Sequence, residues 1–593
     1  MSSLRYAVRI EAPERHTAEI ELRFAPDADE VDITMPAWCP GSYLIRDYAR
    51  YVRDLAAEAD GTPCAVTKID KQTWRIAARG AREIAVRYAV YGHDLTVRTN
   101  HIDAEHAFLH GPATFLYPAS QRRAPIEVEL AFPDAWAMVT AAEPVSATRI
   151  RAASIDELYD QPIHLGPTRV YSVSAKVPVR LAIWGTRAPG GMFDEQRLVT
   201  DVAAIVDDHV ARFGVAPFRA YTFILMLTHD GYGGLEHRAS SVNLYNPHFA
   251  ATRKSYEGLL ELLSHELFHA WNGKRIAPGP LFDFDYSREA YTPCLWVMEG
   301  VTSHYDRYAL RSSGRITAKS YLEKVLDDYA RLKATPGRAR QSLEQSSFDA
   351  WIKLYKPDES NLNTTVSYYL KGGLVMFGLD LRIRRLTGNA RSLDDVLRTM
   401  WKRYGEPGVP YPDELQPVFE EAAGVKLGDI FAQQIRGTAD PDLREDLGFF
   451  GLELRTSADP ATATDGATGT WLGVVASGTK VTSVFDGSPA QVAGISPGDE
   501  LIAVDGFRAA SDGELRNLLS TRTIGEQVRF SLFRRHRLPE VSAVINHAPP
   551  TRYELATVAD PGTGADEYTR WLGEPFPGPA QVLATILTTA RWV

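Results

Sequence analysis

The sequence predicts a multidomain α/β protein with a β-rich N-terminal domain, a central α+β domain and a small β-rich C-terminal domain, for three reasons. Residues 1–175 alternate apolar and polar side chains with the period of half-buried strands. Residues 176–446 combine short apolar strands with helical periodicity. Residues 447–547 return to short strands between glycine turns, and we expect residues 548–593 to form a tail that docks on the body.

The N-terminal domain is predicted to be a sandwich of sheets. Its clearest period-two runs cover residues 6–10, 18–24, 83–90 and 126–130, with Pro and Gly between them. The segment Met35–Tyr43, which contains Trp38 and Pro-Gly, breaks this pattern. It either caps a pocket or forms a turn anchored by its aromatic side chains.

The central domain opens with strands at 180–184 and 221–227 and a helical periodicity over 194–213. Gly233 and Gly234 then precede Glu236, and a further strand follows over 241–245. Two glycines allow close backbone approach, as a peptide lying along an edge strand requires. The alternative is a plain glycine turn with a solvated Glu236.

The motif His265-Glu266-Leu267-Phe268-His269 ends a leucine-rich stretch without Pro or Gly, which favours a helix. Positions i and i+4 share a helix face, so His265 and His269 direct two imidazoles at one point, a geometry that suits Zn²⁺. Glu266 lies at the edge of that face, within reach of a catalytic water. The alternative is an ordinary core helix, but burying two His and a Glu without partners is costly.

A third zinc ligand must come from elsewhere, and Glu299, set among apolar neighbours in a second predicted helix, is the best candidate. His304 and Asp306 remain alternatives. Further on, Tyr368 and Tyr369 open an apolar helix. A tyrosine hydroxyl near the metal donates to an oxyanion, although a Tyr pair in such a helix is usually part of the core.

The C-terminal segment from Thr482 to Gly506 reads as strand, short helix, Pro-Gly turn and strand, and it matches a PDZ domain closely. Trp471–Val474 is then the loop that binds a chain's terminal carboxylate. PDZ grooves bind peptide C-termini by strand addition, so we expect a protein or peptide partner there. The alternative is a domain that only packs on its neighbours.

Composition excludes several classes of protein. The net charge of −10 gives no basic field for nucleic acid. The start of the chain lacks the apolar region of a signal peptide, and no apolar run is long enough to span a membrane. Cys39, Cys64 and Cys294 cannot all pair, which fits a reducing cytoplasm and argues against a thiolate zinc site. We therefore expect a cytoplasmic protein.

Taken together, these stretches resemble one family, the glycyl aminopeptidases with a C-terminal PDZ domain, which are gluzincin relatives of aminopeptidase N. The matching pieces run through the chain in family order: Pro36–Tyr43, Gly233–Arg238, His265–Asn272, Leu295–Tyr305, Tyr368–Gly372 and the PDZ segment. The resemblance implies a thermolysin-like zincin catalytic domain over residues 176–446.

The resemblance also implies roles for individual residues. His265, His269 and Glu299 become ligands of one Zn²⁺ per chain, and Glu266 the general base and then acid. Glu236 falls on the glutamate that binds the substrate's free amine in a G-x-M-E-N motif, although Leu235 replaces Met and His237 replaces Asn. Tyr369 falls on the oxyanion donor of a Y-x-K-G pattern.

One departure concerns the segment between His269 and Glu299, which is longer than in aminopeptidase N. Its stretch from Asp283 to Thr292 is placed to reshape the pocket.

The expected function is therefore zinc-dependent removal of an N-terminal residue, Gly and then Ala, from peptides with a free N-terminus. Two alternatives stay open. One is a zinc endopeptidase in which Glu236 is structural and the PDZ domain recruits substrates. The other is a non-catalytic PDZ adaptor, against which the intact Glu266 argues.

Overall fold

The computed structural model describes residues 3–185, 194–248, 252–457, 470–547 and 552–588, and it confirms the predicted fold class. These residues form two compact units, which are described separately. The first comprises Met1–Thr292, Tyr305–Arg315 and Leu397–Asp413, and the second comprises Pro293–His304, Ile316–Val396 and Glu414–Val593.

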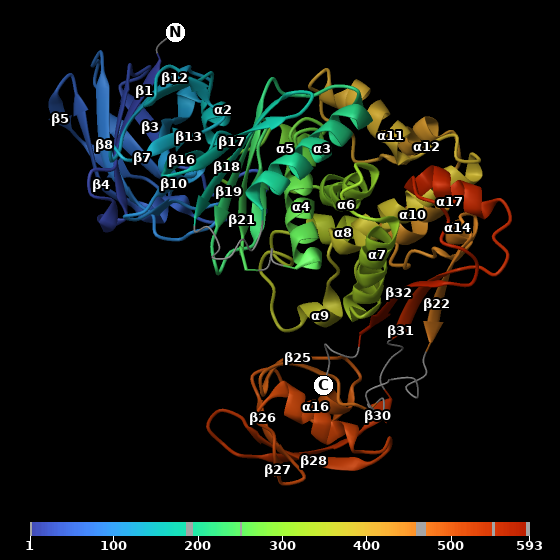
Figure 1. Ribbon diagram of the computed structural model, residues 1–593. Helices are drawn as coiled ribbons and strands as arrows, with labels where there is room; N and C mark the ends of the chain where they lie inside the picture. Colours follow the sequence, from blue (N-terminus) through green and yellow to red (C-terminus); the bar gives the residue numbers. More distant parts are fainter. Residues whose placement is uncertain (1–2, 186–193, 249–251, 458–469, 548–551, 589–593) are drawn as a thin grey trace. The chain divides into compact units, whose positions relative to one another are not determined.

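The N-terminal part of the first unit is built from β-sheets (Figure 1). The largest has eight strands in the order β14 (Glu143–Pro144), β15 (Arg149–Ala152), β12 (Ile126–Ala131), β1 (Leu4–Arg9), β2 (Thr17–Phe24), β8 (Ile84–Tyr91), β4 (Val52–Ala59) and β5 (Thr62–Cys64). A four-stranded sheet contains β11 (Tyr117–Pro118), β3 (Glu30–Thr34), β7 (Thr73–Ala77) and β6 (Val66–Lys68).

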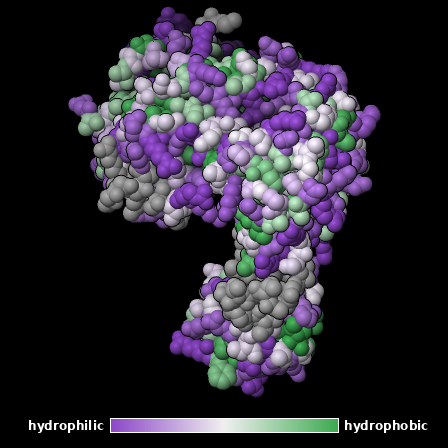
Figure 2. All heavy atoms as spheres, turned by 45° about the vertical axis from the view of Figure 1, so that its right-hand side comes forward, coloured by the Kyte–Doolittle hydropathy of each residue, from purple (hydrophilic) through white to green (hydrophobic). Residues whose placement is uncertain are grey.

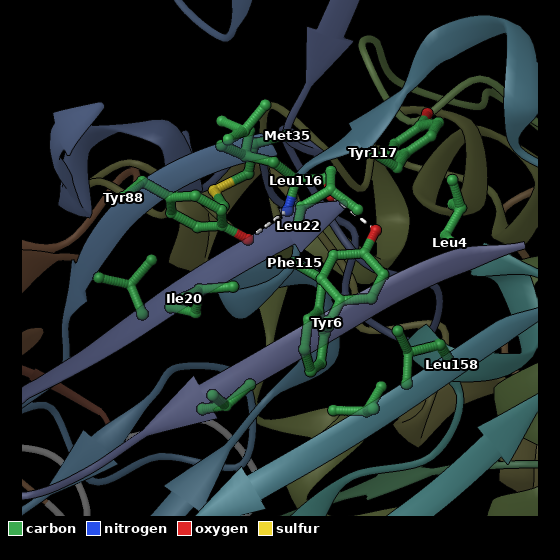
Figure 3. Packing of buried hydrophobic residues seen from close by; sticks show 14 of the residues in the cluster. Leu4, Tyr6, Ile20, Leu22, Met35, Tyr88, Phe115, Leu116, Tyr117 and Leu158 are labelled. Carbon is green, nitrogen blue, oxygen red and sulfur yellow. Dashed lines mark hydrogen bonds between the residues drawn. The ribbon is translucent and has the colours of Figure 1, made fainter. Parts of the chain in front are cut away.

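The core of these sheets is aromatic and aliphatic, and two of its tyrosine hydroxyls bond to the backbone of Leu116 (Figure 3). Tyr6 donates its hydroxyl to the carbonyl of Leu116 at 2.7 Å, and the Leu116 amide donates to the Tyr88 hydroxyl at 3.0 Å. The alternation of buried and exposed residues along β2 is what period-two sequence demands of a strand with one face on the core.

A third sheet has the order β13 (Ala137–Val139), β16 (Ile163–Gly166), β10 (Ala107–Leu109) and β9 (His101–Ile102). The fourth lies mostly in the predicted central domain, although its first strand precedes residue 176. Its order is β17 (Arg169–Ser174), β18 (Pro178–Gly185), β19 (Tyr221–Leu227), β21 (Ser240–Tyr245) and β20 (Gly233–Glu236). Strands β18, β19 and β21 run parallel, and β20 pairs antiparallel with β21 at the edge.

Two long helices accompany the last sheet. Helix α3 (Glu195–Phe213) begins at Asp194, whose side chain accepts from the Gln196 amide, and α4 (Arg253–Phe268) begins at Thr252, which caps the Ser255 amide. Helix α4 packs against β20 and β21 as well as α3. The sheet edge therefore lies beside the helix that carries the histidine motif.

The second unit is mainly helical before residue 447. Its elements include a π-helical turn at Trp296–Gly300 and the helices α7 (Ala318–Lys333) and α10 (Leu370–Leu386). The π-helical turn runs directly into α6 (Val301–Ser312), whose residues from Tyr305 onward belong to the first unit. Gly300 packs on Gly372, where a Cβ at either position would meet the other backbone within 3.0 Å. The absence of two side chains thus lets the π-turn and α10 approach closely.

The PDZ sheet has the order β24 (Val474–Ser477), β25 (Lys480–Val484), β26 (Glu500–Val504), β28 (Gln527–Phe533) and β29 (Glu540–Val544), with β27 (Phe507–Arg508) beside β26 and the helix α16 (Asp512–Ser520). Strand β24 forms one edge of the sheet as described. The preceding residue pair, β23 (Thr470–Trp471), is linked to α16 because the Thr470 hydroxyl donates to the Leu519 carbonyl.

The tail after residue 551 packs with the helical part of the same unit. Strands β31 (Arg552–Thr557) and β32 (Val582–Leu587) form a sheet with β22 (Leu452–Ser457), and α7 contacts β31 and β32. In α17 (Gly564–Leu572), the buried Trp571 contacts the rings of Tyr321, Phe377 and Phe450. The final Trp592–Val593 lies outside the described residues.

Hydrophilic side chains predominate on the face drawn in Figure 2. Among the helices of the described segments, none combines the length and the apolar character needed to cross a bilayer.

Candidate active site and metal centre

Helix α4 positions the first two predicted ligands. The packing of its leucines fixes the orientation of this helix, because Leu259, Leu260, Leu263 and Leu267 are all buried. The helix ends at Phe268, and His269 continues as its C-cap with helical backbone angles (φ −60°, ψ −20°). The i, i+4 relation of the two histidines is therefore kept, although the second lies at the very end of the helix.

The hydrogen-bond partners of the two imidazoles indicate the same tautomer for both. His265 Nδ1 lies 3.0 Å from Asp306 Oδ2, and His269 Nδ1 lies 2.8 Å from the carbonyl oxygen of Asn272. Because both partners accept hydrogen bonds, both Nδ1 atoms carry the proton and both Nε2 atoms present lone pairs. The Nε2 atoms are 3.1 Å apart. Two facing lone pairs, each with a hydrogen-bond acceptor on the far nitrogen of its ring, fit a zinc ion.

Glu266 lies buried beside the edge strand β20. A Cβ on Gly234 would come within 2.1 Å of Glu266 Oε1, so only glycine leaves room for this carboxylate. Its other oxygen, Oε2, is buried and has no hydrogen-bond partner among the described residues. The pKa of Glu266 is raised to about 7, chiefly by burial; the His265 imidazole opposes this rise and the nearby Glu236 carboxylate adds to it.

Glu236 is the last residue of strand β20, and its carboxylate lies close to that of Glu266. Carboxylate oxygens of Glu236 and Glu266 and a ring nitrogen of His269 all lie within 4.8 Å of one another, and all three residues are buried. Two carboxylates this close repel each other unless a cation lies with them. Next to them, a Cβ on Gly233 would meet no atom within 4 Å, so the strand is open on that side.

The segment Met35–Tyr43 is both a turn anchored by aromatic side chains and a wall beside Glu236. Trp38 is anchored by its indole hydrogen bond to the Asp285 carbonyl and by contact with the Phe284 ring, 5.3 Å between centroids. Gly41, with φ of +87°, lies against Glu236: a Cβ there would come within 2.5 Å of Glu236 Oε1. The loop is therefore an aromatic-anchored turn that also walls the Glu236 carboxylate, and the stretch from Asp283 supplies the anchors.

A buried ion pair behind Glu236 was not apparent from the sequence. Lys274 Nζ lies 3.0 Å from Asp160 Oδ1, and the same oxygen lies 3.4 Å from His237 Nδ1. Burial alone would raise the pKa of Asp160, but Lys274 and His237 hold it well below its usual range. Burial lowers the pKa of Lys274, whereas Asp160 and then Glu236 raise it, with a net rise. His237 thus faces a carboxylate, not solvent, and no local pattern marks Asp160.

Two further predicted residues belong to the second unit. Glu299 lies in the π-helical turn and is 2 % exposed. Tyr369 immediately precedes α10; its ring stacks on Tyr368 with centroids 4.8 Å apart, and its hydroxyl lies 3.2 Å from that of Tyr355. Lys371 directs its Nζ to the Thr438 carbonyl at 3.1 Å, so it anchors the start of α10.

The alternatives for the third ligand are placed differently. Asp306 is the partner of His265 Nδ1, a supporting role in the first unit. His304 is buried, with its ring 6.3 Å from that of Phe377.

Three family models match the chain. The peptidase M61 N-terminal domain matches residues 5–167, the M61 glycyl aminopeptidase residues 258–375 and a PDZ domain residues 448–545. The chain belongs to the M61 glycyl aminopeptidase family. The second of these matches contains the histidine motif, Glu299 and Tyr369, so this M61 chain is a peptidase.

One solved structure has the same fold over nearly the whole chain, and a second is more distant. An aminopeptidase N family protein from Idiomarina loihiensis is 29 % identical with a TM-score of 0.89, covering 96 % of this M61 chain and 100 % of its own. An M1 zinc metallopeptidase from Deinococcus radiodurans is 15 % identical with a TM-score of 0.47, covering 74 % of this chain and 95 % of its own. A search of curated proteins found no match.

Proposed function

We propose that the chain is a zinc-dependent aminopeptidase that releases N-terminal Gly, and then Ala, from peptides. The observation that supports it most is the second carboxylate: Glu236 lies within 4.8 Å of Glu266 and His269, at the end of an edge strand. An endopeptidase needs no second carboxylate beside its general base. In an aminopeptidase, the ammonium group of the substrate would neutralise Glu236, and this contact would place the first peptide bond of the substrate at the metal.

The proposed metal ligands are His265, His269 and Glu299. The facing Nε2 atoms of the histidines support the first two. Glu299 is proposed from the family resemblance, and two observations support it: the residue is buried, and its carboxylate is a donor that zinc takes. Zinc in such a site acts as a Lewis acid and makes water a nucleophile near neutral pH.

The chain's own residues carry the proton transfers. Glu266 takes a proton from the attacking water and delivers it to the leaving amine, because its free Oε2 has no competing partner among the described residues. Glu236 holds the substrate ammonium. Tyr369 donates a hydrogen bond to the developing oxyanion, and the hydroxyl of Tyr355, 3.2 Å away, orients it.

A preference for Gly must work by exclusion, because Gly offers no side chain to bind. The loop that includes Gly41 lies directly against Glu236 and supports this reading. A substrate whose ammonium contacts Glu236 places its first Cα near that wall.

The PDZ domain is proposed to bind the C-terminus of a peptide or protein. Its edge strand β24 and the preceding loop Trp471–Val474, tied to α16 through Thr470, have the arrangement that strand addition needs.

The test uses glycyl, alanyl and leucyl chromogenic substrates and a glycyl peptide with and without an N-terminal acetyl group. We expect the order Gly, Ala, Leu and loss of cleavage on acetylation. Glu236→Gln should lower kcat/KM for free glycyl substrates about 10²-fold, since it leaves the ammonium without its charge partner. Equal cleavage of acetylated and free peptides would establish the endopeptidase instead, and metal-loaded protein without hydrolysis would leave the PDZ adaptor.

A further inference from the structure

A second cluster of histidines lies far from the helix motif in sequence, at the turn between β9 and β10. Five of the chain's 15 histidines form a linked array there: His16, His93, His101, His106 and His164, with successive ring centroids between 3.8 and 5.2 Å apart. The proposed peptidase chemistry uses none of them.

Three side chains of this turn converge. One ring nitrogen of His101, one carboxylate oxygen of Asp103 and one ring nitrogen of His106 all lie within 4.8 Å of one another. Asp103 Oδ1 is held by the amides of Glu105 at 2.8 Å and His106 at 3.0 Å. Its other oxygen, Oδ2, is thereby aimed at His101 Nε2, 3.0 Å away. The turn itself fixes the carboxylate.

The imidazoles retain nitrogens with no partner. His106 is 0 % and His101 is 6 % exposed, and among the described residues neither His106 Nε2 nor His101 Nδ1 has a hydrogen-bond partner. His106 Nδ1 lies 3.1 Å from His164 Nε2, and His164 Nδ1 lies 3.0 Å from the Thr168 hydroxyl. If His106 Nδ1 donates to His164 and His164 Nδ1 donates to Thr168, His106 Nε2 keeps a lone pair. Hydrogen-bond partners behind a metal ligand set its tautomer in the same way. Leaving such buried nitrogens unsatisfied costs stability.

We propose that His101, Asp103 and His106 bind a second divalent transition metal ion, separate from the catalytic one. Two imidazoles and one carboxylate are the donors that Zn²⁺ takes with a water in the fourth position. The Asp103 side chain is 28 % exposed, which gives an ion a route from solvent.

The ion would have a structural role. The His106 ring stacks on Trp184 of β18 with centroids 3.5 Å apart. Fixing the turn by a metal therefore also fixes the β9–β10 hairpin on the sheet that ends in Glu236.

The test counts zinc in the full chain after chelation and reloading with zinc chloride. Asp103→Asn keeps an oxygen for the Glu105 and His106 amides but replaces the ligating oxygen with an amide. Glu105→Gln makes the same charge change at an exposed carboxylate of the same turn. We expect Asp103→Asn to hold one zinc fewer per chain than the wild type, with hydrolysis of glycyl substrates unchanged, and Glu105→Gln to match the wild type.

His106→Gln gives an independent check, and zinc should raise the Tm of both site variants less than that of the wild type. Equal zinc content in wild type, Asp103→Asn and His106→Gln would overturn the proposal. So would an equal loss of zinc in Glu105→Gln, because charge alone would then account for it.

Discussion

Two pairs of histidines in the first unit bring nitrogens together in different ways. In the helix pair, His265 and His269, the two Nε2 atoms face each other at 3.1 Å, and each Nδ1 has an acceptor of its own. In the turn pair, His101 and His106, the carboxylate of Asp103 stands beside one ring and a third imidazole stands behind the other.

The surroundings of the two pairs suit different roles, a catalytic one for the helix pair and a structural one for the turn pair. The helix pair has Glu266 with an unpartnered oxygen, an edge strand and a second carboxylate beside it. The turn pair has Asp103 as its proposed third ligand, and the buried ring of His106 stacks on Trp184. A metal at the helix pair is placed to act on a peptide, and a metal at the turn pair is placed to hold two sheets together.

The general base should give the largest effect. Glu266→Gln is expected to lower kcat for glycyl substrates by about 10²–10⁴, the usual contribution of acid–base catalysis, with zinc content unchanged. Steady-state kinetics and metal analysis on one preparation check this. Hydrolysis at the wild-type rate would mean that another group is the base.

The buried ion pair beside the helix pair should give the next largest effect. Lys274→Met leaves Asp160 and Glu236 buried without their cation, and we expect a loss of about 3–5 kcal/mol in the free energy of unfolding. The double variant Lys274→Met with Asp160→Asn should recover part of it. Urea denaturation of the three proteins measures both values, and an unaltered Lys274→Met would show that the pair contributes nothing.

The same pair predicts a pH dependence. Because the pKa of Asp160 is lowered in the folded state, its contribution is present above its unfolded value of about 4 and is lost as the pH falls below it. The stability deficit of Lys274→Met should therefore be larger at pH 7 than at pH 3, where part of this contribution is already lost. A deficit independent of pH would assign it to lost packing.

A matched substitution sharpens the comparison of the two pairs. Asp306→Asn removes the carboxylate behind His265 and should weaken catalytic zinc 10–100-fold, with activity restored by excess zinc. Asp103→Asn at the turn pair should leave activity unchanged. Zinc titration of activity compares them, and equal effects would mean that the two sites are not separate.

The wall of the amine site should give the smallest effect. Gly41→Ala would place a Cβ 2.5 Å from Glu236 Oε1 and push the carboxylate aside, so we expect a severalfold rise in KM for glycyl substrates with little change in kcat. Gly61→Ala is the control, because Gly61 has a similar φ of +81° but open space around it. Equal effects of the two would point to backbone strain.

Local patterns were enough to predict much of this molecule. The period-two runs of the N-terminal domain became β1, β2, β8 and β12, and the leucine-rich stretch became α4 with both histidines on one face. Gly233-Gly234-Glu236 became an edge strand, as close backbone approach requires. In each case the signal lies within a few residues of chain.

Non-local contacts explain what the sequence could not predict. Lys274 pairs with Asp160 across more than a hundred residues, and His106 contacts His164 on another strand. Strand β22 pairs with β31, from the far side of the PDZ segment. The missing side chain of Gly234 also makes room for Glu266, a residue 32 positions further along the chain. A periodic sequence pattern gives no information on contacts between residues that lie far apart in the chain.

The most direct test of this account is anomalous diffraction at the zinc edge from crystals of the zinc-loaded chain. We predict a peak about 2.0–2.1 Å from Nε2 of both His265 and His269, with a carboxylate oxygen of Glu299 as the third protein ligand. A zinc-loaded crystal with no peak between these two nitrogens would contradict it.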